Sequence, residues 1–165
     1  SQKKRFIIAG LVLLIIVVVV LGVDAFQRQQ SVIPQGTSTP LPAGSIPIYL
    51  DGQLVGGFVP ADLGKLQQVS FVDAAEQKPQ DGWLLSDVIL LYVDPAKLSV
   101  GSKVVVSSTS RGKSIELTWA EIREPANMVM FDLSNRGTLK LVSLLPRLDT
   151  RDEWVQDVDK IEIIQ

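Results

Sequence analysis

The chain has 165 residues, with 16 Lys and Arg side chains against 18 Asp and Glu, and it contains no Cys and no His. These two absences exclude disulfides, thiolate or imidazole metal sites, and catalysis by Ser-His-Asp or Cys-His groups. Acid–base chemistry would fall to carboxylates, lysines or tyrosines. The length suggests one domain, and the hydrophobic fraction of 46% is high because one segment concentrates apolar residues.

That segment is residues 6–23, FIIAGLVLLIIVVVVLGV, which carries no charge. As a helix it rises about 27 Å, and its extension to residue 26 covers a hydrocarbon core of about 30 Å. Lipid offers the backbone no other hydrogen-bond partner, so residues 6–26 are predicted to form a transmembrane helix. The positive residues Lys3, Lys4 and Arg5 predict that residues 1–5 are cytoplasmic and that the rest of the chain is extracytoplasmic.

A cleaved signal peptide is the alternative interpretation, because small residues follow the apolar run at Val23 and Ala25. The run is, however, longer than the roughly 7–15 apolar residues typical of a signal peptide. The chain also begins at Ser1, as it would after removal of an initiator methionine. We therefore expect a retained anchor in the cell membrane.

Residues 27–47 are rich in Pro, Gly and Ser and contain four of the nine prolines. This composition favours extended backbone, so the segment is predicted to be a tether, either a plain spacer or one ordered along a partner. Residues 1–30 hold four basic and one acidic side chain, whereas the remainder holds twelve basic and seventeen acidic, a net charge of −5. An acidic external domain argues against nucleic acid as a partner.

Residues 48–165 are predicted to form an α+β domain that is mainly β with short helices. Residues 48–50 and 53–55 flank Asp51-Gly52, a strong hairpin signal, and residues 68–72 alternate like a half-buried strand. Residues 83–93 are apolar nearly throughout and predict a helix that Ser86 can cap and that ends before Asp94-Pro95. Its apolar face is expected to pack on a sheet and comprises Leu85, Val88, Ile89 and Tyr92.

The second half of this domain continues with β-branched runs at 103–107 and 114–117, which predict another hairpin. Thr118 to Glu121 form a capping box that opens a short helix ending before Pro125. Residues 128–133 and 138–144 are predicted strands, and the segment 154–164 ends the chain in a strand. The core is expected to be anchored by three tryptophans, Trp83, Trp119 and Trp154.

The order of these segments resembles the molybdopterin-binding domain of sulfite-oxidase-type oxidoreductases. The segments that carry the resemblance are GWLLSDVILLYV (82–93), VVVSSTSRGKSIELTWAEI (104–122), Asn135-Arg136-Gly137, LKLVSLLP (139–146) and EWVQDVDKIEII (153–164). Within them, the positions that match the family's pattern are Pro146, Trp154, Val155, Ile161 and Ile163. Active members of that family bind molybdenum through a cysteine thiolate and hold the pterin phosphate with Arg and His. The resemblance therefore implies a pared-down copy of the fold that has no cofactor.

No catalytic, cofactor-binding or metal-binding residue is assigned from the sequence. The dense carboxylates Asp149, Asp152, Glu153, Asp157 and Asp159 are interleaved with Arg and Lys and lack the glycine of a calcium loop, which favours salt bridges. The Ser- and Arg-containing segment 108–113 lacks the spacing of a phosphate-binding loop and is predicted to be a plain turn.

These observations predict a non-catalytic, single-pass accessory subunit whose partners are the lipid bilayer and other subunits of a membrane complex. The small residues Ala9, Gly10 and Gly22 are expected to let neighbouring helices approach. The resemblance favours a respiratory or photosynthetic electron-transfer host, of which the quinol-oxidising alternative complex III is an example. The alternatives are a free-standing anchored ligand-binding or sensor module and a hydrolase that uses carboxylates alone.

Overall fold

The computed structural model describes residues 40–165 of the chain. The predicted anchor at 6–26, its small residues Ala9, Gly10 and Gly22, and most of the tether lie outside the described residues. Among the helices of residues 40–165, none is long and apolar enough to cross a membrane.

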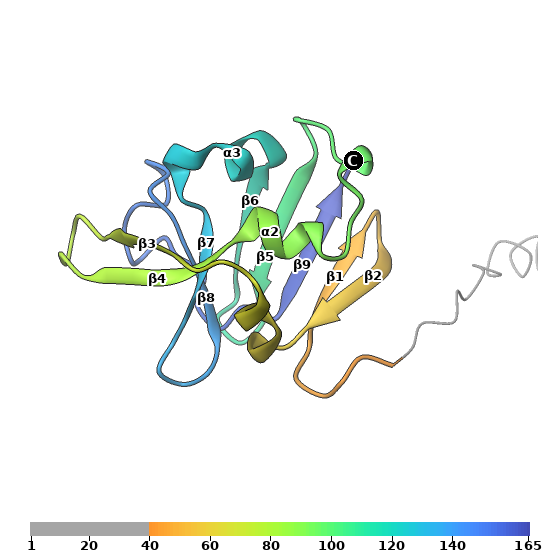
Figure 1. Cartoon of the computed structure of the whole chain (residues 1–165), viewed down its shortest axis with the longest axis horizontal. Helices are drawn as coiled ribbons and strands as arrows, with labels where there is room; N and C mark the ends of the chain where they lie inside the picture. The colour runs from red at the N-terminus through yellow and green to blue at the C-terminus, as the bar shows by residue number, and fades with distance from the viewer. Residues whose placement is uncertain (1–39) are drawn as a thin grey trace, which may run out of the picture. The chain divides into compact units, whose positions relative to one another are not determined.

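The described residues form two β-sheets accompanied by short helices, which confirms the prediction of a mainly β domain (Figure 1). The five-stranded sheet has the order β2-β1-β9-β5-β6, with β2 Gln53–Phe58, β1 Ile46–Leu50, β9 Lys160–Ile164, β5 Lys103–Ser108 and β6 Lys113–Thr118. The four-stranded sheet has the order β3-β4-β7-β8, with β3 Val69–Val72, β4 Pro79–Leu84, β7 Met130–Leu133 and β8 Leu139–Val142. The helices are α2 Leu85–Leu90 and α3 Trp119–Arg123, with 3-10 turns at η1 Pro60–Lys65, η2 Pro95–Lys97 and η3 Pro125–Asn127.

The predicted hairpins of the five-stranded sheet are confirmed. β1 pairs antiparallel with β2 through a turn in which Asp51 and Gly52 have φ values of 48° and 78°. Positive φ at both central residues is the geometry of a type I′ turn, which matches the twist of the flanking strands. β5 and β6 form the second hairpin. β1 begins at Ile46, within the last two residues of the segment that composition assigns to the tether.

The first α-helix begins at Leu85, two residues before the start that a cap at Ser86 predicts. Strand β4 continues to Leu84, and the Leu85 N–H donates to the Val129 carbonyl at 3.0 Å, so the chain stays in the sheet until that point. The predicted cap at Ser86 is wrong, because Ser86 lies inside the first turn of α2 and its hydroxyl contacts the Asp87 carboxylate at 3.4 Å. The predicted apolar face is confirmed for Leu85, Val88 and Ile89, which are fully buried, whereas Tyr92 is partly buried against the same core.

The capping box of α3 is confirmed. The Thr118 hydroxyl accepts a hydrogen bond from the Glu121 N–H at 3.2 Å, and the Glu121 carboxylate accepts one from the Thr118 N–H at 2.8 Å. These reciprocal bonds satisfy two main-chain donors that a helix start otherwise leaves free. The helix consequently starts at the predicted residue despite having only five residues.

The core has a large and a small part on the two faces of the four-stranded sheet. Along β7, Phe131 belongs to the large cluster, which draws on both sheets, whereas its neighbour Met130 belongs to the small one. Successive strand residues point to opposite faces, so the two clusters lie on opposite sides of this sheet. The predicted core positions of the tryptophans are confirmed, because Trp83, Trp119 and Trp154 are all buried.

The backbones of the paired strands β4 and β7 approach each other closely at Gly82. This residue pairs with Asp132, and a Cβ built at Gly82 would lie 1.9 Å from the carbonyl oxygen of Phe131. The glycine is therefore needed for close approach of two backbones, a role that strand glycines often have.

We expect the substitution Gly82→Ala to lower the free energy of unfolding by about 1–3 kcal/mol, because the added methyl group must displace backbone. Urea unfolding followed by tryptophan fluorescence would measure the change. Gly101→Ala is the matched control, since a Cβ there meets no atom within 4 Å. Equal stability of the two variants would contradict the close approach.

Candidate functional site

A hollow of about 600 Å³ opens where strands β4 and β7 diverge. The pairing of these strands covers residues 82–84 and 130–132. Beyond it, β4 stays with β3, while β7 turns back into β8, and in Figure 1 the β3–β4 hairpin projects away from the β7–β8 turn. The hollow is lined by Gln68, the segment 78–83 without Gly82, the segment 132–136, Lys140, Arg151, Trp154 and Gln156.

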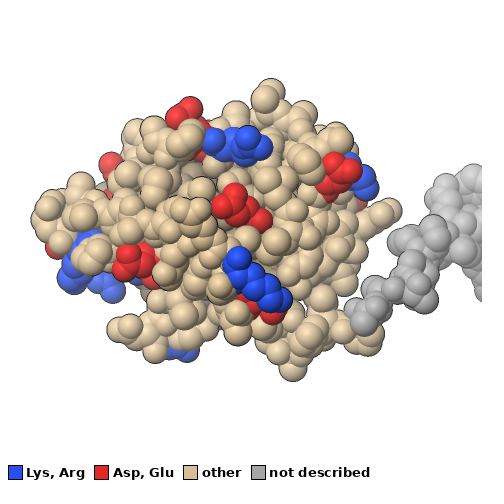
Figure 2. Space-filling view, viewed as in Figure 1, with Lys and Arg blue, Asp and Glu red and all other residues tan. Residues whose placement is uncertain are grey.

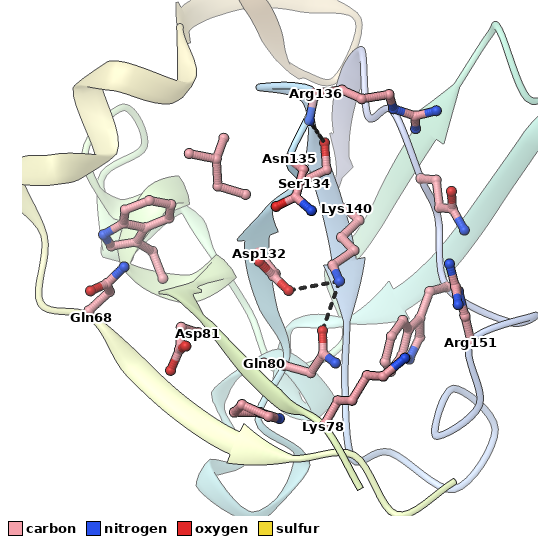
Figure 3. A pocket seen from close by; sticks show the side chains of 15 residues that line it. Gln68, Lys78, Gln80, Asp81, Asp132, Ser134, Asn135, Arg136, Lys140 and Arg151 are labelled. Carbon is pink, nitrogen blue, oxygen red and sulfur yellow. Dashed lines mark hydrogen bonds and ion pairs between the residues drawn. The ribbon is translucent and has the colours of Figure 1, made fainter. Parts of the chain in front are cut away.

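Lys140 occupies the middle of this hollow (Figure 3). Its ammonium group donates to the Asp132 carboxylate and to the Gln80 side-chain oxygen, both at 2.8 Å. It also lies 5.5 Å from the centre of the Trp154 ring, within the range of a cation–π interaction. The sheet places the Lys140 and Asp132 side chains next to each other, because these residues face each other directly in the pairing of β7 with β8.

One rim of the hollow carries a carboxylate shared between two cations. Glu76 accepts from the Lys78 ammonium at 2.8 Å and pairs with the Arg151 guanidinium at 3.1 Å. The hydrogen bonds from Lys78 and then from Arg151 lower the pKa of Glu76 below its usual value. The cationic side chains are 64% and 59% exposed, against 33% for Glu76, so they present their charge outward.

A second shared carboxylate lies at Asp157. It accepts from the Thr138 hydroxyl at 2.7 Å and pairs with Arg111 at 2.6 Å and Arg136 at 2.8 Å. The hydrogen bond from Thr138, followed by the contacts from the two arginines, lowers the pKa of this carboxyl group. Arg136 is again the more exposed partner, at 58% against 18% for Asp157.

The predicted ion pairing of the carboxylate-rich segment 149–159 is confirmed at Asp157. The partners of its charged residues lie in other segments, since Arg147 pairs with Glu121 and Arg151 with Glu76. Asp159 instead accepts from the Thr109 N–H at 2.7 Å. Within residues 40–165, no three carboxylates are grouped to hold a metal ion. The segment 108–113 is the predicted turn between β5 and β6.

Sequence reasoning did not find the hollow. Its walls come from four segments, around residues 68, 80, 135 and 153, that become neighbours only in the folded sheet. The sequence signal for it was weak and consisted of the basic residues Arg136, Lys140 and Arg151, which line the hollow. A second, apolar hollow of about 490 Å³ shares Trp83 and Leu133 with the first.

The side chains do not fit the molybdenum cofactor of the resembled family. That cofactor requires a thiolate ligand, and the chain has no Cys and no His. Acidic and basic side chains are interspersed on the face of the domain drawn in Figure 2. Comparison of the chain with models of known protein families and with the sequences of curated proteins gives no match to either.

The shared carboxylate at Asp157 predicts a pH-dependent contribution to stability. Because its folded-state pKa is lowered, the contribution is complete above the unfolded-state pKa of about 3.9 and is lost as the pH falls through the folded-state value. We expect Asp157→Asn to lower the free energy of unfolding at pH 7 by about 1–2 kcal/mol.

The measurement is urea unfolding of the wild type and the variant at several pH values between 2 and 7. The difference between the two proteins should shrink toward acid, because protonation of Asp157 removes the same charge. Asp149→Asn, at an exposed aspartate of the same segment, is the control and should have little effect at any pH. A pH-independent difference at Asp157 would disprove the electrostatic role.

Proposed function

We propose that the chain is a non-catalytic, single-pass accessory subunit of a multisubunit membrane complex, with its domain on the extracytoplasmic side. The apolar run at 6–23 and the positive residues before it support an anchor in this orientation. The two-sheet domain supports a folded part that can contact other subunits. The other membrane subunits and the bilayer are the partners in this proposal.

The observation that carries the non-catalytic role is the engagement of Lys140. A lysine ammonium has three N–H donors, and here two are accepted by Asp132 and Gln80 while the Trp154 ring lies against the charge. A catalytic lysine acts as a base or nucleophile through a free amine. Lys140 is instead held by these contacts as a structural group at the centre of the hollow.

An electron-transfer complex is the host that we propose. The resemblance to a molybdopterin-binding domain supports a descent from a redox protein, and the lack of a thiolate supports the loss of the cofactor. The quinol-oxidising alternative complex III is one host of this kind. Fold alone does not specify function, and recovery of the chain with haem-containing subunits is the observation that tests this host.

The second candidate function is a free-standing, membrane-anchored ligand-binding module. The observation that favours it is the polar hollow with Lys78, Arg136 and Arg151 at its rims. Such a module would require no other subunit, which is where the two candidates differ.

Purification in a mild detergent would distinguish them. We expect the full chain to migrate on a native gel in a complex with other membrane proteins, and mass spectrometry of that band to identify haem-containing subunits. Migration of the chain without protein partners would contradict the accessory-subunit proposal and favour the free-standing module.

The small residues of the predicted anchor give a further prediction. We expect Gly10→Leu combined with Gly22→Leu to reduce the recovery of partner subunits at least several-fold, because bulky side chains prevent close approach of helices. Val18→Leu with Val20→Leu is the matched control, since these positions are already bulky. Quantitative mass spectrometry of the purified complexes is the measurement, and equal recovery from both variants would rule out close helix approach at these glycines.

A further inference from the structure

We propose that the hollow between β4 and β7 is the docking site for an extended, acidic segment of a partner subunit. This inference rests on the proposed function, because it assigns the surface through which the domain contacts a neighbouring subunit. It depends on three features of the hollow, namely an interrupted strand ladder, a surplus of exposed positive charge and an open shape.

The first feature is the strand ladder, which stops inside the hollow. The pairing of β4 with β7 ends at Gly82 and Asp132, although β4 begins at Pro79 and β7 continues to Leu133. Asp81 and Leu133 would form the next pair, and both line the hollow unpaired with each other. An extended peptide commonly binds by continuing an interrupted or edge strand through its main chain. The divergence of β4 and β7 thus offers backbone edges to such a segment.

The second feature is charge, which selects the chemistry of the segment. Glu76 neutralises one of its two cations, Lys78 and Arg151, and Asp157 neutralises one of the arginines 111 and 136. Lys140 is balanced by Asp132, and Asp81 adds one negative charge, so the hollow and its two clusters together keep a net charge of +1. The residues after position 30 carry an overall net charge of −5. Figure 3 shows Arg136 and Arg151 along one side of the hollow and Gln68 and Asp81 along the other. Carboxylates are the complementary groups, because guanidinium groups bind them with directed hydrogen bonds.

The third feature is the open shape of the hollow, which favours a segment of a macromolecule over a small ligand. Small-molecule sites enclose most of the ligand surface and are lined mainly by apolar groups. Here the lining is mostly polar, and the apolar side chain of Leu133 at the rim is 44% exposed. A bound segment would cover Leu133 while its carboxylates reached the arginines.

The test is binding of a fluorescein-labelled peptide of alternating Glu and Thr, eight residues long, to the full chain in a non-ionic detergent. Fluorescence anisotropy should show saturable binding that weakens as NaCl is raised, because salt screens exposed charges. The same peptide with Lys in place of Glu should not bind. Arg136→Gln combined with Arg151→Gln should weaken binding at least tenfold.

Two further variants separate docking from general effects of charge and folding. Lys65→Gln with Lys97→Gln removes the same charge from exposed lysines outside the hollow and should retain wild-type affinity. Leu133→Asp keeps both arginines but places a negative charge at the rim, and it should also weaken binding. Thermal unfolding of each variant would show whether the domain remains folded.

Several outcomes would overturn the inference. They are absence of peptide binding to the wild type, equal loss in the lysine control, competition by inorganic phosphate, preferential binding to phosphatidylglycerol vesicles, or arginine-dependent self-association of the chain. Peptide binding by a chain that co-purifies with no subunit would instead contradict the accessory-subunit proposal alone. A complex that assembles normally with the arginine variant, together with absence of peptide binding, would contradict the docking site alone.

Discussion

Strand β9 is the element on which the domain depends, because it is the central strand that joins the two hairpins of the five-stranded sheet. β9 lies between β1, to which it is parallel, and β5, to which it is antiparallel. Its side chains Ile161 and Ile163 are fully buried. Without it, the sheet would separate into the hairpins β1–β2 and β5–β6, and isolated two-stranded hairpins are marginally stable. The fold therefore depends on long-range pairing, which in the case of β1 and β9 joins residues more than a hundred positions apart and is slow to form.

The route by which the chain reaches β9 also builds the hollow. The segment before β9 contacts the four-stranded sheet, where Val155 bridges to Leu141 and the Val158 N–H donates to the Leu139 carbonyl at 2.9 Å. It then joins the other sheet through the Asp159 N–H and the Ser107 carbonyl, also at 2.9 Å. This crossing brings Trp154 to the hollow and Asp157 to its ion pair with Arg136, a residue that lines the hollow. The segment before β9 therefore both positions this central strand and supplies part of the wall of the candidate site.

The parts of the fold that the sequence predicts are those specified by neighbouring residues. The turn at Asp51-Gly52 and the capping box at Thr118 depend only on residues within a few positions, so they form as the sequence predicts. Strand β4 was missed because its sequence, PQDGWL, combines Pro, Asp and Gly, and its extended form comes from pairing on both edges. The same pairing carries the strand to Leu84, and α2 begins directly after it at Leu85 rather than after a cap at Ser86. The hollow was missed for a related reason, since it depends on the divergence of two strands whose pairing was not predicted.

Pre-orientation of the paired cations lowers the conformational-entropy cost of binding a negative group. An exposed lysine or arginine loses rotamer freedom when a ligand immobilises it, which subtracts from the affinity. Here Glu76 and Asp157 already orient four cationic side chains in the folded domain, so part of that loss precedes binding. Each carboxylate is shared by two cations and so leaves a net positive charge beside a strand edge. Such an arrangement fixes where a negative group is attracted.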